Sequence, residues 1–242
     1  MSEDKGQPKV VFCCPTLKKP YPQFLAAMEA EIHHLEAAGY DHEFGWEVGC
    51  PYISAARAAL LRRALDAKAD IIVFLDHDLS WKPGDLTRLI QTEGEVVAGL
   101  YRFKQPVVEY MGTIEAGPDR YPIVRESDGA LKAVRVPGGF LKIQRSTVQR
   151  IMRAHPELCY GDPIAPHVDL FNHGAFEGVW WGEDYAFSRR WRAMGRDIWV
   201  VPDLDITHHD HEAGDFPGNV HQFLLNPPKP EVSGCPPTVS LP

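Results

Sequence analysis

Two aspartates directly follow a fully apolar segment of the chain. In "IIVFLDHDLSW", residues 71–75 lead into Asp76, His77 and Asp78. In an extended chain, side chains two positions apart share a face, so Asp76 and Asp78 are expected to face one site while His77 points away. Their carboxylate oxygens suit Mg²⁺ or Mn²⁺, ions that are often shared with phosphate oxygens. The spacing therefore predicts a divalent-metal site, with a helix cap or a solvated turn as the alternative.

A second acidic pair lies in "WWGEDYAFSRRW", where Glu183 and Asp184 fall in the first turn of a predicted helix. Acidic residues at a helix start interact favourably with the helix dipole, which is the structural explanation of the pair. The functional explanation is a general base, or a carboxylate that holds an acceptor hydroxyl. Trp180 and Trp181 stand just before the pair, either as stacking surfaces for a sugar or as part of the core.

A histidine cluster occurs in "DITHHDHEAGDF", which contains His208, His209 and His211. Such clusters are typical of metal binding, and one ligand with two surface neighbours is expected rather than three ligands. Along an extended segment, His208 and Asp210 would face one side and His209 and His211 the other.

These groups need a fold that positions them, and the first 75 residues predict one. Strands are expected at 9–16, 42–49 and 71–75, separated by helices at 22–38 and 53–67. This strand-helix alternation predicts a parallel, doubly wound sheet. The third strand is apolar throughout, as expected where helices cover both faces. Ligands of such sheets bind beyond the carboxyl ends of the strands, where Asp76 and Asp78 fall.

The remaining chain predicts more of the same sheet and a small antiparallel layer. "KPGDLTRLIQ" favours a short helix, "GEVVAGLYRFK" and "VPGGFLKI" favour strands, and residues 107–136 resemble an antiparallel hairpin layer. Helices are expected in "STVQRIMRAHPEL" and at 183–194, and a last strand in "RDIWVVPD". We expect one domain over residues 1–225 and an extended, proline-rich tail over 226–242.

Composition indicates a folded protein rather than a membrane-embedded one. The chain has 242 residues, of which 44% are hydrophobic and 24% charged, and no apolar run approaches the ~18 residues that span a bilayer. The N-terminus is polar, and the five cysteines are scattered without metal-ligand spacing. Together these features predict a cytoplasmic protein, in the host cytoplasm if the gene belongs to a phage.

The net charge of −8 argues against a large nucleic-acid footprint. A basic stripe on the helices offers a local exception, and we interpret it as a solvated helix face in preference to a DNA-binding one. Its members are Arg145, Arg150, Arg153, Arg189, Arg190 and Arg192.

Taken in order, these segments resemble the GT-A glycosyltransferases, and within them the small bacterial- or phage-type, family-2-like enzymes. The resemblance runs from about residue 9 to about residue 224. Its segments are "FCCPT", "SAARAALLRRAL", "FLDHDLSWKPGDLTRLI", "VVAGLYRFK", "VPGGFLKIQRS" and "WGEDYAFSRRWRAMGRDIWVVPDLDITHH". The resemblance implies a Rossmann-like, doubly wound mixed sheet that is mainly parallel, with a small antiparallel layer. It also implies transfer of a sugar from a nucleoside-diphosphate sugar to an acceptor hydroxyl.

The resemblance assigns a metal and a base to the acidic groups. Asp76 and Asp78 match the D-x-D pair that holds Mn²⁺ or Mg²⁺ on the donor diphosphate, and His208 matches the late histidine that completes the ligands. The segment after His208 departs from the usual pattern, so His209 or His211 is an alternative ligand. Asp184 matches the catalytic base of inverting members, with Glu183 beside it, although retaining members also carry acids nearby. We favour inversion.

The resemblance also assigns donor contacts. Pro15 and Thr16 match the turn that meets the nucleobase or ribose, and Arg57 matches a basic residue that contacts the nucleotide. A glycine turn under the donor sugar or acceptor is matched by Gly138 and Gly139. The remaining expected donor contacts are His77 and Trp181.

Two other functions are alternatives. A nucleotidyltransferase on a related sheet would require a glycine-rich phosphate loop after the first strand, and "CCPTLKKP" has no glycine. A catalytically silent carbohydrate-binding module would not require the acidic pairs and the histidine together. The donor is expected to be a UDP-sugar. The acceptor stays open between a saccharide, a small metabolite and a modified DNA base, and the sequence does not address the oligomeric state.

Overall fold

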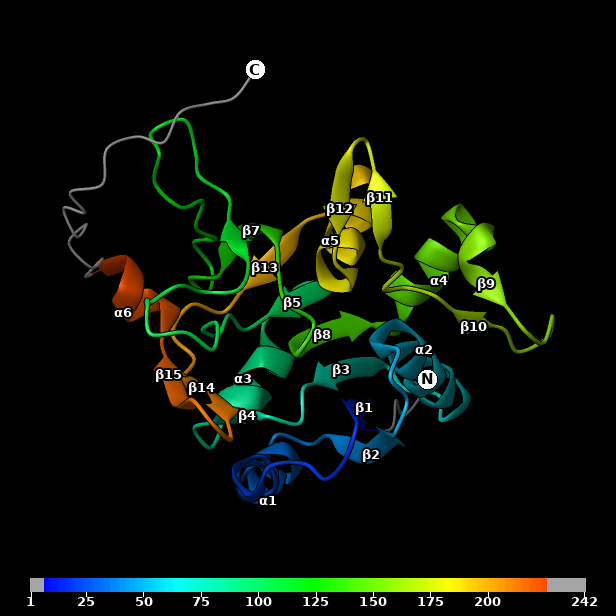
Figure 1. Cartoon of the computed structure of the whole chain (residues 1–242), viewed down its shortest axis with the longest axis horizontal. Coiled ribbons are helices and arrows are strands. Elements are labelled where there is room, and N and C mark those ends of the chain that lie inside the picture. The colour runs from blue at the N-terminus through cyan, green and yellow to red at the C-terminus, as the bar shows by residue number, and fades with distance from the viewer. Residues whose placement is uncertain (1–6, 226–242) are drawn as a thin grey trace, which may run out of the picture.

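The computed structural model describes residues 7–225, and the tail predicted for 226–242 lies outside this range. An eight-stranded sheet forms its centre, in the order β2-β1-β3-β8-β5-β13-β7-β6 (Figure 1). The strands of this sheet are β1 (Lys9–Thr16), β2 (Asp41–Val48), β3 (Ile71–Leu75), β5 (Val96–Ala98), β6 (Thr113–Ile114), β7 (Leu131–Arg135), β8 (Phe140–Gln144) and β13 (Ile198–Val200).

Six of the eight strands run in one direction, because only β7 and β8 oppose their neighbours. The predicted doubly wound, mainly parallel mixed sheet is therefore confirmed, and so is the antiparallel layer, in which β6 pairs with β7. The position of β8 was not predicted. It lies antiparallel between β3 and β5, so its first residue is at the same sheet edge as their last residues.

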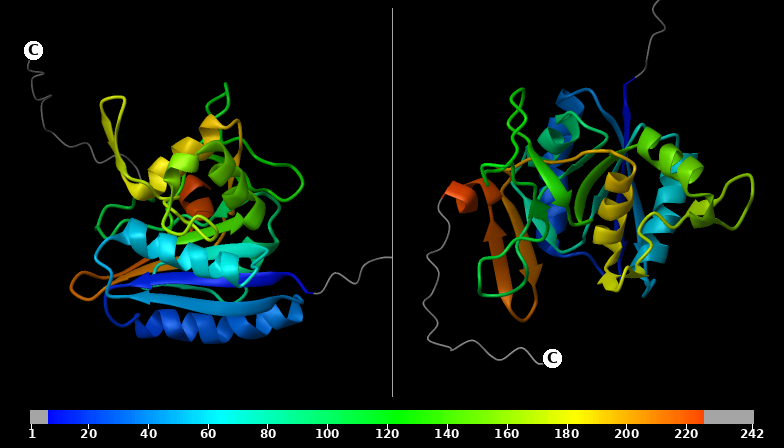
Figure 2. Two further views of the ribbon diagram at one scale, coloured as in Figure 1. Left: turned by 90° about the vertical axis from the view of Figure 1, so that its right-hand side faces the viewer. Right: turned by 90° about the horizontal axis from the view of Figure 1, so that it is seen from above.

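Helices cover both faces of the sheet, as the apolar third strand predicted. Residues of β3 alternate between two cores: Ile72 and Phe74 belong to one, and Val73 and Leu75 to the other. The first core also contains residues of α2 (Ile53–Asp66), α4 (Arg145–Ala154) and α5 (Glu183–Ala193), and the second contains residues of α1 (Pro22–Ala37) and α3 (Asp85–Gln91). In the left view of Figure 2, α1 and α2 lie on opposite sides of the strands.

Small antiparallel sheets surround the main one. One contains β15 (Gly214–Gly218), β14 (Ile206–Asp210) and β4 (Leu79–Trp81), and another pairs β10 (His167–Val168) with β9 (Cys159–Tyr160). A hairpin of β11 (Gly174–Phe176) and β12 (Val179–Trp181) leads into α5 (Figure 1). The remaining elements are the 3-10 turn η1 (Pro156–Leu158) and helix α6 (Val220–Leu225). None of the helices within residues 7–225 has the length and apolarity required to cross a membrane.

Candidate active site

The carboxyl edge of the main sheet collects the residues that the sequence singled out. Asp76 directly follows β3, whose last four residues are buried and whose backbone pairs with β1 and β8 on either side. Each buried apolar side chain contributes ~1.5–3 kcal/mol to anchoring the strand. The backbone N–H of Asp76 also donates to the carbonyl of Gly139, at 2.9 Å. Asp76 is therefore held rigidly at the sheet edge.

Arg57, on the first turns of α2, connects the two acidic pairs. Its side chain is only 2% exposed. Its Nη1 lies 2.5 Å from Asp184 Oδ1 and 3.4 Å from Glu183 Oε1, and its Nη2 lies 3.1 Å from Asp76 Oδ1. Burial lowers the pKa of the guanidinium, but the three carboxylates raise it by more. Arg57 therefore stays charged and fixes Asp76 and Asp184 relative to each other; its predicted nucleotide contact stays a prediction.

Asp184 is a largely buried carboxyl at the start of α5, with 15% of its side chain exposed. Burial is the largest influence on it and raises its pKa to about 6, with smaller increases from Glu183 and Asp76, while Arg57 opposes the rise. The 2.5 Å contact with Arg57 would by itself predict a lowered pKa. However, the single positive charge of Arg57 is shared among three carboxylates, so burial outweighs it and the pKa of Asp184 stays raised. A carboxyl with a pKa near neutrality suits proton transfer.

Gly138 and Gly139 are required because the backbone passes close to the acidic groups. A Cβ on Gly138 would lie 2.5 Å from Asp184 Oδ1 and 2.6 Å from Arg57 Nη1. A Cβ on Gly139 would collide with the Asp76 carboxylate and the Tyr101 hydroxyl. The glycines thus pack against the carboxylates, and the predicted contact with donor sugar or acceptor stays a prediction.

Asp78 lies in a second cluster of charges. Its Oδ2 is 3.4 Å from Nε2 of His208 on β14 and 2.5 Å from Nζ of Lys104, and Lys104 is also 3.8 Å from Asp210. Burial raises the pKa of Asp78, but the hydrogen bonds and charges of His208 and Lys104 lower it further, so the net shift is downward. Asp78 is therefore ionised at neutral pH.

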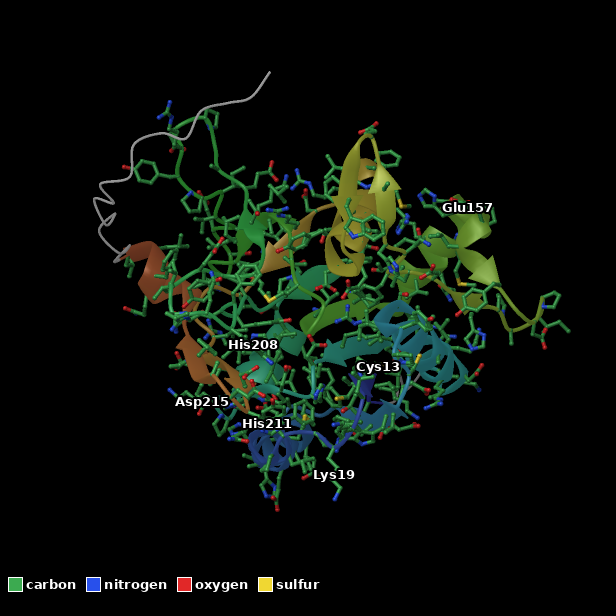
Figure 3. All side chains as sticks on the ribbon, in the orientation of Figure 1. Cys13, Lys19, Glu157, His208, His211 and Asp215 are labelled. Carbon is green, nitrogen blue, oxygen red and sulfur yellow. The ribbon has the colours of Figure 1, made fainter. Side chains whose placement is uncertain are left out.

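The three histidines separate as the alternation predicted. His208 and Asp210 face the Asp78 cluster, while His209 bonds Ser80 and Asp215 in the small sheet, at 2.7 and 2.6 Å. The ring of His211 stacks on Tyr21, with centroids 4.1 Å apart. Figure 3 labels His208 and His211 on the side of the molecule where β14 and β15 lie. Of the three histidine rings, only that of His208 lies close enough to the Asp78 carboxylate to bind the same metal ion.

The donor set suits a divalent ion with two protein ligands. An Asp78 carboxylate oxygen and the His208 Nε2 converge, and Mg²⁺ is commonly held by one or two carboxylates together with substrate phosphates. Asp76 does not join them: one of its oxygens bonds Arg57 and the other accepts from the Tyr101 hydroxyl at 3.2 Å. Across residues 7–225, no three His, Cys, Asp or Glu side chains are grouped closely enough to hold an ion by themselves. Lys104 contacts the same Asp78 oxygen that an ion would use.

A cavity of about 290 Å³ opens over these groups. Pro15 and Thr16 from the end of β1 border it, and so do the acidic residues. The remaining lining includes Cys50, Ile53 and Met111. His77 also lines it, so the expectation that His77 points away is wrong: residues 77 and 78 form a turn rather than extended chain, and all three residues border the same space. Three of the expected donor contacts do not border this cavity: Trp181 borders a different one along α5, and Gly138 and Gly139 lie behind the carboxylates.

Sequence reasoning missed Lys104 and Tyr101. Tyr101 is fully buried, bonds Asp76, and packs edge-on against His208 with ring centroids 5.1 Å apart. Both residues follow β5 in the quoted segment "VVAGLYRFK". Their position after a predicted strand could have identified both residues, because the carboxyl ends of parallel strands such as β3 and β5 meet at the same sheet edge.

Comparison with known proteins adds two distant similarities. No protein-family model matches the sequence, and no curated protein matches it significantly. The structure is similar to the catalytic domain of Drosophila beta1,4-galactosyltransferase 7, in complex with xylobiose, at a TM-score of 0.43 and 15% identity. This match covers 80% of the present chain and 64% of the other. A second similar structure is a glycosyltransferase involved in glycosylation of the major capsid of PBCV-1.

That second similarity has a TM-score of 0.34 and 10% identity, and it covers 61% of this chain and 66% of the other. The chain thus spans slightly less than two thirds of either protein. Both are glycosyltransferases, the class that the sequence motifs resemble. Similarity at this level does not assign an activity.

Proposed function

We propose that the protein transfers a sugar from a nucleoside-diphosphate sugar to a hydroxyl group of an acceptor, with inversion and with a divalent metal ion. One observation carries the proposal: a single cavity at the carboxyl edge of the sheet is bordered by Asp76, Asp78, Glu183 and Asp184. These residues come from segments more than 100 positions apart in the chain, and the fold brings their four carboxylates to one space.

The donor is expected to place its diphosphate near Asp78. In this proposal, Asp78 and His208 hold Mn²⁺ or Mg²⁺, whose contribution would be to neutralise the charge that develops on the diphosphate leaving group. The Lys104 ammonium, 2.5 Å from Asp78, adds a positive charge at the same place. Pro15 and Thr16, which border the same cavity, are the proposed contacts of the nucleoside, for which a uridine is the first choice.

Asp184 is the proposed general base. The acceptor oxygen forms a bond to the anomeric carbon, the bond from that carbon to the diphosphate oxygen breaks with its electron pair, and the hydroxyl proton goes to Asp184. Arg57 keeps the Asp184 carboxylate in one orientation, and Glu183 is available to hold the hydroxyl. Because the pKa of Asp184 is raised to about 6, the rate is expected to increase with pH through that value.

Titration calorimetry tests the proposal directly. The protein is titrated with UDP, UDP-sugars and the other nucleoside diphosphates, first with Mn²⁺ and then with EDTA. Asp78→Asn should abolish the Mn²⁺-dependent binding, while the matched variant Glu126→Gln, at an exposed carboxyl outside the cavity, should bind as the wild type does. Binding that is unaffected by EDTA and by Asp78→Asn would refute the metal assignment. No binding of any nucleotide would favour a carbohydrate-binding module.

A further inference from the structure

A second cavity, of about 320 Å³, lies along α5. Arg135 of β7 and Trp181 of β12 border it, together with Tyr185 and Arg189, which are one helical turn apart on α5. The β11–β12 hairpin that carries Trp181 stands beside α5 in Figures 1 and 2. None of these four residues borders the cavity over Asp76 and Asp78, so this is a separate space.

Two arginines that border the cavity, Arg135 and Arg189, form no ion pair with a carboxylate within the described residues. Nε of Arg135 donates to the Thr113 hydroxyl at 2.9 Å, and no acidic side chain in the part of the chain that the structure describes pairs with Arg135 or Arg189. Arg192, by contrast, is neutralised by Glu115 at 2.5 Å. In a chain with a net charge of −8, two unpaired guanidinium groups in one cavity make a local site for an anion.

Aromatic rings hold both guanidinium groups in place. Cζ of Arg135 lies 4.4 Å from the ring centroid of Tyr185, and Cζ of Arg189 lies 3.7 Å from that of Phe176 and 5.6 Å from that of Trp181. Stacked arginines lose less side-chain freedom on binding and present a planar fork that matches a carboxylate or phosphate. The aromatic rings also offer apolar faces, and the volume is at the small end of ligand sites, suited to about one sugar unit.

The two cavities adjoin through a short segment of chain. Met111 borders the cavity of the acidic residues, and Thr113 borders the second cavity. Between them, the backbone N–H of Gly112 donates to the Tyr185 hydroxyl at 3.1 Å. Tyr185 directly follows Asp184 on α5. The second cavity therefore lies two residues from the first along this segment and one residue from the proposed base along α5.

We propose that this second cavity is the acceptor subsite for a saccharide that carries a carboxylate or a phosphate, with Arg135 and Arg189 binding the anion. The inference rests on the proposed function, because it takes Asp184 to be the base that receives the acceptor hydroxyl. It narrows the acceptor from any hydroxyl compound to an acidic sugar unit.

The arginines of this part of the molecule do not favour a nucleic-acid acceptor. The basic stripe expected on the helices is not continuous: Arg150 pairs with Glu95 at 3.4 Å and Arg192 with Glu115, so their charges are already neutralised. The expectation of a solvated helix face is wrong for Arg190, which is buried and donates to a backbone carbonyl. What remains is a compact, positively charged anion site rather than a track for a phosphate backbone.

The test uses sugars that differ only in charge. The full chain is titrated with p-nitrophenyl β-glucuronide against p-nitrophenyl β-glucoside, and with glucose 6-phosphate against glucose, each with and without saturating UDP. The variants are Arg135→Gln and Arg189→Gln. Arg153→Gln is the matched control, because it removes the same charge from an exposed arginine that does not border the cavity.

The charged member of at least one pair should bind about tenfold or more tightly, and UDP should not displace it. A preference confined to the glucuronide identifies a carboxylate sugar, and one confined to glucose 6-phosphate a phosphate sugar. Either arginine variant should remove the preference without weakening UDP binding, and Arg153→Gln should leave both unchanged. Equal binding of charged and neutral sugars, loss of the preference in Arg153→Gln, or displacement by UDP would overturn the proposal. UDP binding reports separately on the proposed function, so failure of the donor site and failure of the acceptor subsite are distinguished.

Discussion

Replacing Asp184 by asparagine should stabilise the protein at neutral pH and not at acidic pH. The folded state holds the pKa of Asp184 at about 6, above its ordinary value of 3.8, so the folded protein binds the proton more tightly than the unfolded chain does. This contribution to stability is fully present below pH 3.8 and is lost as pH rises through about 6. Asparagine keeps the shape of the side chain and cannot ionise.

The size of the effect follows from the two pKa values. At 1.36 kcal/mol per pKa unit, the difference between them corresponds to ~3 kcal/mol over the whole range, of which about 2 kcal/mol falls between pH 4.5 and pH 7.5. The free energy of unfolding of Asp184→Asn, relative to the wild type, should therefore increase by about 2 kcal/mol between these two pH values. Arg57 keeps its contacts with Asp76 and Glu183 in the variant.

Urea unfolding, followed by tryptophan fluorescence at both pH values, measures this difference. Glu126→Gln serves as the control, because Glu126 is exposed and its replacement should leave the free energy within about 0.5 kcal/mol of the wild type at either pH. If the advantage of Asp184→Asn stays constant or shrinks as the pH rises, then Arg57 rather than burial governs Asp184, and our account of the base is wrong.

Three further variants probe the same groups. Arg57→Met should lower the free energy of unfolding by about 3–5 kcal/mol, because it leaves three buried or half-buried carboxylates without their shared cation; wild-type stability in urea would contradict this. Gly139→Ala should lower the free energy of unfolding by about 1–3 kcal/mol, since its Cβ would collide with the Asp76 carboxylate and the Tyr101 hydroxyl; wild-type stability in urea would exclude that collision. Lys104→Met should tighten Mn²⁺ binding about tenfold in the absence of nucleotide, because it removes the ammonium from Asp78; unchanged or weaker binding, with free Mn²⁺ measured by electron paramagnetic resonance, would show that Lys104 does not compete.

Much of the fold could be predicted because local patterns determine it. The apolar run before Asp76 predicted a buried strand and placed its end correctly, and the alternation along the histidine segment predicted that His208 and His209 face opposite sides. The direction of β8 could not be predicted from the same pattern. An apolar run identifies a strand, but a strand in the centre of a sheet looks the same whether it is parallel or antiparallel to its neighbours.

The electrostatic arrangement of the site was also beyond the sequence. Arg57 was expected at the nucleotide, yet its partners Glu183 and Asp184 lie 126 and 127 positions further along the chain. Lys104 has no motif at all, and only the three-dimensional position of the chain after β5 brings it to Asp78, 26 positions earlier. Such pairs depend on the crossing of distant segments, which neither spacing nor composition encodes.

The same separations bear on how the protein acquires its site during folding. The contacts of Arg57 with Asp184 and of Asp78 with His208 both close very long loops, and long-range contacts form late because ordering the intervening chain costs entropy first. A nascent chain emerging from the ribosome can complete α2 and β3 long before His208 has been synthesised. Until β14 docks beside β4, Asp78 lacks its histidine partner. Nucleotide binding would therefore be among the last native properties to appear on refolding.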